Sequence, residues 1–145
     1  VIKLNTFNPE LTLIKGNYTK LSPNKFELLD IKKGIIYLSK LNSHNHTQGI
    51  VIRNGSVVAK ETSYGTKKML QSIKKPKNSG GILIKLPKKK QDLRADLPTI
   101  GLETLKDCKR AGIKGVVLKS NQNILLDKVK CINFANKNKL FLKIK

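Results

Sequence analysis

The sequence has no tryptophan, and it contains few aromatic residues, few cysteines and few acidic residues. Aromatic residues make up 5% of the 145 residues and form no patterned face, so the sequence lacks the stacking platforms that favour RNA recognition. No run of 18 apolar residues is present, so we expect no transmembrane helix. Cys108 and Cys131 lack metal-binding spacing, which indicates buried or free thiols in a reducing compartment.

Positive charge is the strongest feature of the composition. Thirty lysines and arginines against nine acidic residues give a formal net charge of +21, which favours anionic partners. Only Arg53, Arg94 and Arg110 are arginines, and lysine is a less specific phosphate ligand than the planar guanidinium group. The many lysines, asparagines and isoleucines indicate a compositional bias, so the charge alone is weak evidence for nucleic-acid binding.

Strand and helix patterns alternate along the chain. Ser22 followed by Pro23 predicts a helix N-cap and first turn, and Asn54-Gly55 between two β-branched runs predicts a tight hairpin turn. Gly112 is a plausible C-cap for the third helix. The predicted helices span 23–41, 66–74, 100–111 and 127–137, and further short strands lie at 82–86 and in the runs GVVLKS and NILLDK on either side of Asn121.

This alternation predicts an α/β fold: a layered domain with a mixed β-sheet and flanking helices. Residues 1–20 carry no helical stripe and are predicted to be an interdomain linker or lead-in, with the domain itself spanning 21–145. His44 and His46 form an H-x-H pair without a third nearby ligand, so we expect no metal site there. Gly80-Gly81 precedes a strand, which is the wrong order for a phosphate-binding loop.

The stretch LPKKKQDLRADLPTIGLET, residues 86–104, places two carboxylates and an arginine within five residues of a basic chain. It follows a predicted strand, and ligands of open α/β sheets bind beyond the carboxyl ends of strands. Asp92 and Asp96 could hold Mg²⁺, while Arg94, Lys85 and Lys88 could bind phosphate oxygens near the start of the next helix. These are the parts of metal-assisted phosphoryl chemistry. From the residues alone, a solvated loop with a surface salt bridge is the alternative.

Three blocks, GIVIRNGSVVAKETSYGT, GILIKLPKKKQDLRADLPTIGLET and NILLD, resemble the C-terminal domain of the UDP-2,3-diacylglucosamine pyrophosphatase family of the LpxI type. The resemblance covers about residues 11–145 and includes the ordered motif Q-D-x-R-x-D-L-P-T-I-G and the later Thr104. It implies hydrolysis of the diphosphate bond of UDP-2,3-diacylglucosamine to UMP and 2,3-diacylglucosamine 1-phosphate, in lipid A synthesis. It also implies a divalent cation, Mg²⁺ or Mn²⁺, and a cytoplasmic enzyme in peripheral contact with the inner membrane.

The resemblance also implies roles for individual residues. Asp96 matches the family's principal catalytic aspartate, and we expect Asp96 and Asp92 to be the catalytic residues and the metal ligands. The expected substrate-binding residues are Lys85, Lys88, Gln91, Arg94, Thr99, Glu61, Gly65 and Thr66.

The chain departs from the family pattern at Tyr64 and Lys67, where the family usually has acidic residues. The family has two domains with the lipid product held between them, and we expect this chain to carry only the second. Two alternatives therefore stay open: a non-catalytic basic module that binds RNA or an anionic membrane, and a degenerate fragment that keeps the fold without the chemistry. Under the enzymatic interpretation no nucleic-acid partner is expected, and homo-oligomerisation is left open.

Overall fold

The computed structural model of the protein describes residues 13–41, 48–73, 80–87, 99–120 and 123–145. These residues form a mixed six-stranded sheet in the order β1-β8-β6-β4-β2-β3 and a separate two-stranded sheet, β5-β7. The predicted α/β class with a mixed sheet and flanking helices is confirmed. The strands are β1 (Gly16–Asn17), β2 (Gly49–Arg53), β3 (Ser56–Lys60), β4 (Ile82–Lys85), β5 (Thr99–Ile100), β6 (Gly115–Leu118), β7 (Ile124–Leu125) and β8 (Phe141–Ile144).

Strand direction determines which residues meet at each end of the sheet. The central strands β4, β6 and β8 are parallel, while β2 runs antiparallel to both β4 and β3. The register pairs Gly49 with Lys85, so the start of β2 lies beside the carboxyl end of β4. Because β3 runs in the same direction as β4, the end of β3 lies at this edge as well. We call it the carboxyl edge.

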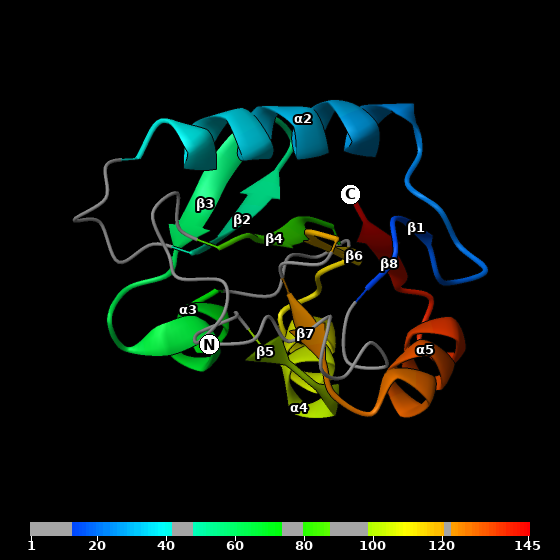
Figure 1. The fold of residues 1–145 in the computed structure, drawn as a ribbon. Helices are drawn as coiled ribbons and strands as arrows, with labels where there is room; N and C mark the ends of the chain where they lie inside the picture. The colour runs from blue at the N-terminus through cyan, green and yellow to red at the C-terminus, as the bar shows by residue number, and fades with distance from the viewer. Residues whose placement is uncertain (1–12, 42–47, 74–79, 88–98, 121–122) are drawn as a thin grey trace, which may run out of the picture.

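Helices cover both faces of the sheet, as Figure 1 shows. Helix α2 (Lys25–Ser39) lies over one face, and α3 (Gly65–Gln71), α4 (Leu102–Arg110) and α5 (Lys128–Lys137) lie on the other. Successive strand residues point to opposite faces. Accordingly, Ile50 and Ile84 pack in the cluster that includes Ile31 of α2, whereas Val51 and Leu83 pack in the other cluster.

The start of the first predicted helix needs correction. The N-cap is Asn24 rather than Ser22, and the helix begins at Lys25. The Asn24 side chain accepts a hydrogen bond from the Glu27 N–H at 2.8 Å, and the Glu27 carboxylate accepts one from the Asn24 N–H at 3.0 Å. This reciprocal capping box satisfies two backbone donors, so it fixes the start of α2 two residues later than predicted and leaves Pro23 outside the helix.

The predicted hairpin is confirmed. Strands β2 and β3 pair antiparallel across Asn54 and Gly55, whose φ angles of 50° and 80° fit the tight primed turn that favours this dipeptide. Gly112 adopts a φ of 78° directly after the C-cap Ala111, and the Ile113 N–H donates to the Cys108 carbonyl, which closes α4.

Other boundaries differ by a few residues. The helix predicted from residue 100 begins at Leu102 because Thr99–Ile100 pairs with β7 as a strand. The runs GVVLKS and NILLDK both contain strands, but β6 lies in the large sheet and β7 in the small one. The helix predicted over 66–74 spans Gly65–Gln71.

The described part of the lead-in packs against the domain. Leu13 is buried in the core, β1 pairs with β8, and the Tyr18 N–H donates to the Leu142 carbonyl at 2.9 Å. His44 and His46 lie outside the described residues. Among the helices that the structure describes, none is long and apolar enough to span a bilayer.

Candidate functional site at the carboxyl edge

Three of the predicted site residues meet at the carboxyl edge, although they come from different elements. Lys85 is the last residue of β4, Glu61 directly follows β3, and Thr66 lies in the first turn of α3. The Lys85 Nζ donates to the Thr66 hydroxyl at 2.6 Å, and that hydroxyl donates to Glu61 Oε1 at 2.7 Å. The Lys85 Nζ also lies 3.5 Å from Glu61 Oε1. We call this set the Glu61–Thr66–Lys85 network.

The local sequence explains how the network forms. Since side chains alternate along β4, Lys85 lies on the same face as Leu83, which is the face that α3 covers. The Glu61 N–H donates to the Gly49 carbonyl at 2.8 Å, which extends the β2–β3 pairing by one residue beyond β3. A Cβ atom on Gly49 would lie 3.0 Å from Glu61 Oε2, so glycine at this position leaves room for the carboxylate.

The network is notable for its burial. Lys85 is 7% exposed and Glu61 is 6% exposed, so both charged groups are largely removed from water. Moving two charges from water into the protein costs several kcal/mol per ion, which the attraction between them rarely exceeds. The Thr66 hydroxyl bridges the pair as acceptor and donor, which satisfies part of the hydrogen-bonding capacity of both groups. A buried ion pair adds little net stability, so we interpret this one as a candidate functional feature.

The other predicted site residues are only partly covered by the structure. Gly65 begins α3 with a φ of 92°, directly before Thr66. Thr99 is exposed at the start of β5, in register with Ile124 of β7. The remaining predicted residues lie outside the described residues: Lys88, Gln91, Asp92, Arg94 and Asp96.

The two departures from the family pattern lie outside the network. Tyr64 is 81% exposed, and Lys67 is exposed on the first turn of α3. Neither side chain belongs to the Glu61–Thr66–Lys85 network, in which Glu61 and Lys85 are buried and Thr66 is half-buried. The network therefore forms with tyrosine and lysine at these two positions.

Two residues at this edge were not singled out from the sequence. Gly49 accommodates the Glu61 carboxylate, and its place at the head of the β-branched run GIVIR is the only signal that it gives. Asn123 is fully buried beside the end of β6, where its Oδ1 accepts from the Lys119 N–H at 2.8 Å. Within the described residues its Nδ2 has no acceptor. A lone asparagine before a short strand gives no sequence signal for such burial.

The described residues hold no metal-binding cluster of three or more His, Cys, Asp or Glu side chains. Both cysteines are free and buried, as predicted. Burial, with a smaller contribution from Asp127, raises the pKa of Cys131 to about 11. Burial next to Asp107 raises the pKa of Cys108 further above its ordinary range. Neither thiol is therefore a thiolate nucleophile near neutral pH.

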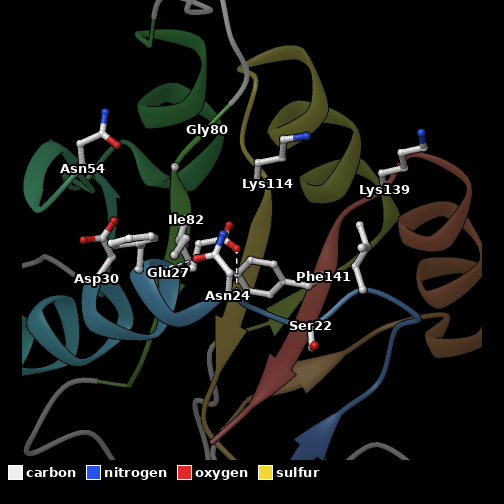
Figure 2. Close-up of a pocket in the computed structure, with 13 residues that line it drawn as sticks. Ser22, Asn24, Glu27, Asp30, Asn54, Gly80, Ile82, Lys114, Lys139 and Phe141 are labelled. Atoms are coloured by element: carbon white, nitrogen blue, oxygen red, sulfur yellow. Dashed lines mark hydrogen bonds between the residues drawn. The ribbon is translucent and has the colours of Figure 1, made fainter.

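A hollow lies at the opposite end of the sheet, where the parallel strands begin (Figure 2). Its volume is about 380 Å³, and we call this end the amino edge. Gly80 and Gly81 precede β4 there, Lys114 precedes β6, and Lys139 lies before β8. Other polar lining residues come from the start of α2 and the hairpin turn: Ser22, Asn24, Glu27, Asp30 and Asn54.

Comparison with known proteins supports the resemblance seen in the sequence. The family model described as the LpxI C-terminal domain matches residues 14–143, which is most of the chain. The chain belongs to this family. It is also 32% identical over 141 residues to the UDP-2,3-diacylglucosamine pyrophosphatase LpxI of Caulobacter vibrioides. That alignment covers 92% of this chain and 50% of the relative, so the chain spans about half the length of the curated protein that it matches.

Proposed function

We propose that this LpxI-family domain takes part in hydrolysis of the diphosphate bond of UDP-2,3-diacylglucosamine. The products would be UMP and 2,3-diacylglucosamine 1-phosphate, as expected for a step of lipid A biosynthesis. The observation that carries the proposal is the Glu61–Thr66–Lys85 network at the carboxyl edge, with its buried ion pair. It joins two separate family motif blocks in space, and it lies at the edge where α/β sheets bind their ligands.

The network has a clear chemical use in this proposal. A diphosphate substrate brings several negative charges to the site, and Lys85 is a preorganised cation at the end of β4. Thr66 and Glu61 fix its ammonium group by hydrogen bonds, so little side-chain entropy is lost when an anion approaches. Lys85 would offset part of the charge on the phosphate oxygens, together with Arg94.

A divalent cation belongs to the same proposal. Glu61 is within 3.5 Å of the Lys85 ammonium, and a second cation beside that group would be repelled. The ligands for Mg²⁺ would therefore come from Asp92 and Asp96, which lie outside the described residues. When bound, the cation would polarise a phosphoryl oxygen and activate water. The carboxylates are the ligand type that Mg²⁺ prefers.

The proposed substrate also suggests where the protein works. Two acyl chains hold such a molecule at a lipid surface, so the proposal includes a cytoplasmic enzyme in peripheral contact with the inner membrane. The net charge of +21 favours attraction to anionic lipid headgroups.

The test is UMP release from UDP-2,3-diacylglucosamine, with and without Mg²⁺, by this chain joined to its native upstream segment if one exists. We expect metal-dependent release, and we expect Asp96→Ala to lower the rate about a thousandfold or more because a principal metal ligand is lost. The matched control is Asp30→Ala, since Asp30 lines the hollow at the amino edge and should leave the rate unchanged.

Near-normal turnover by the Asp96→Ala protein would contradict the assignment of Asp96. Absence of release by the folded, complete protein would favour a degenerate domain or a binding module. A binding module that uses phosphate contacts would lose affinity steeply with salt and would tolerate single substitutions in 91–96.

A further inference from the structure

Helix α2 presents an unusual outer face. Its inner side buries Ile31 and Gly34 against the sheet, and among the described elements α2 is the outermost layer on that side (Figure 1). The exposed residues of the helix form what we call the outer face of α2: Lys25, Phe26, Leu28, Leu29, Lys32, Lys33, Ile36 and Ser39.

Apolar side chains on this face are strongly exposed. Phe26 is 68% exposed, Leu29 is 64% exposed and Ile36 is 45% exposed. Residues 26, 29 and 36 recur at helical spacing, so they lie along one stripe opposite the buried residues. Single exposed apolar residues are ordinary, but a stripe of them on one helix marks an interaction surface.

The charge of the same face is of one sign. Lys25, Lys32 and Lys33 are exposed beside the apolar stripe, and no carboxylate is among the exposed residues of α2. Glu27 is engaged in the capping box, and Asp30 is half-buried at the side of the helix. The partner of this face must therefore accept aromatic and aliphatic side chains and also carry negative charge.

Another protein and a membrane surface are the two kinds of partner that could meet these requirements, and the membrane fits them better. Protein interfaces are depleted in lysine, whereas helices that lie on membranes combine lysines with phenylalanine and leucine. We propose that the outer face of α2 binds the surface of an anionic phospholipid bilayer. This inference deepens the proposed function, on which its biological meaning rests, because a diacylated substrate resides at such a surface.

The experiment is co-sedimentation of the chain with vesicles of phosphatidylethanolamine and phosphatidylglycerol, compared with vesicles of phosphatidylcholine. The decisive variant is Phe26→Ser/Leu29→Ser, which keeps the net charge. We expect it to weaken binding to the anionic vesicles about tenfold or more, because two apolar side chains that would insert into the bilayer are lost. Lys32→Gln and Lys33→Gln should each weaken binding about fivefold.

The matched control is Ile14→Ser/Val129→Ser, which removes two apolar side chains outside α2 that are at least as exposed as Phe26 and Leu29. It should bind vesicles like the unaltered chain, and circular dichroism should show all variants folded. Equal vesicle binding by the two double variants would overturn the inference and leave only diffuse charge attraction. Conversion of a dimer to a monomer by Phe26→Ser/Leu29→Ser would also overturn it, by assigning the face to self-association. Vesicle binding is measured without turnover, so its outcome is independent of the hydrolase test.

Discussion

The two ends of the central strands differ in how their polar side chains are held. At the carboxyl edge, Lys85 and Glu61 are charged, buried and bridged by Thr66. At the amino edge, the hollow of about 380 Å³ is lined by an exposed Lys139 and by side chains that cap the first turn of α2. Helix capping accounts for Asn24 and Glu27 in that lining, whereas folding alone gives little reason to bury an ion pair. In this domain, the buried ion pair at the carboxyl edge is therefore a better indicator of a functional site than the volume of the hollow at the amino edge.

The largest expected effect comes from removing the buried cation. Lys85→Met leaves the Glu61 carboxylate buried without this ammonium group, and we expect it to lower the free energy of unfolding by about 3–5 kcal/mol. Lys114→Met removes a lysine at the amino edge and should change the free energy of unfolding by less than about 1 kcal/mol. Urea unfolding of both variants measures the difference. An equal loss in the free energy of unfolding for the two variants would remove the contrast between the edges.

A double variant separates stability from chemistry. Glu61→Leu/Lys85→Met replaces both charges with apolar groups, so we expect it to recover much of the stability that Lys85→Met loses. UMP release should stay low, because the cation that we propose to bind the diphosphate is still absent. Recovery of UMP release together with stability would assign the network a purely structural role.

The bridging hydroxyl should have the next largest effect. Thr66→Val keeps the shape of the side chain but removes the group that accepts from Lys85 and donates to Glu61. We expect the free energy of unfolding to fall by about 1–3 kcal/mol, because the buried Lys85 and Glu61 side chains each lose a hydrogen-bond partner. Thr62→Val in the preceding exposed turn is the control and should cost less than about 1 kcal/mol, measured by the same unfolding curves. Similar losses at positions 62 and 66 would argue against a bridge at Thr66.

Two glycines test the packing of the two edges. An alanine Cβ at Gly49 would lie 3.0 Å from Glu61 Oε2 and 3.6 Å from the Ile84 carbonyl oxygen, so Gly49→Ala should cost about 1 kcal/mol through crowding. A Cβ at Gly80 would meet no heavy atom within 4 Å, so Gly80→Ala should change the free energy of unfolding by less than about 0.5 kcal/mol. Thermal unfolding compares the pair, and a greater loss at Gly80 would contradict this description of the carboxyl edge.

Much of the fold could be predicted because local signals and packing agree. The hairpin at Asn54-Gly55 and the helical periodicity of α2 are strong local patterns, and both are confirmed. The strand Thr99–Ile100 was missed because a two-residue strand depends on its partner in β7, which no local pattern encodes. The separation of β6 and β7 into different sheets was likewise not predictable, since it depends on long-range pairing.

The site was predictable in part and for a different reason. Family motif blocks pointed to Glu61, Thr66 and Lys85, but composition and periodicity do not bring residues 61 and 85 together. Their contact depends on the directions of β3 and β4 on either side of β2. The roles of Asp92 and Asp96 stay predictions, because these residues lie outside the described part of the chain.

The smallest predicted effect concerns the amino edge and the start of α2. Asn24→Ala removes the cap that accepts from the Glu27 N–H, so we expect a loss of about 1 kcal/mol in the free energy of unfolding. Ser22→Ala should change stability by less than about 0.5 kcal/mol, because Ser22 is exposed and precedes the cap. UMP release should be the same for both variants, since their side chains line only the hollow at the amino edge. Loss of release by the stable Ser22→Ala protein would bring that hollow into the reaction and reverse the contrast between the two ends.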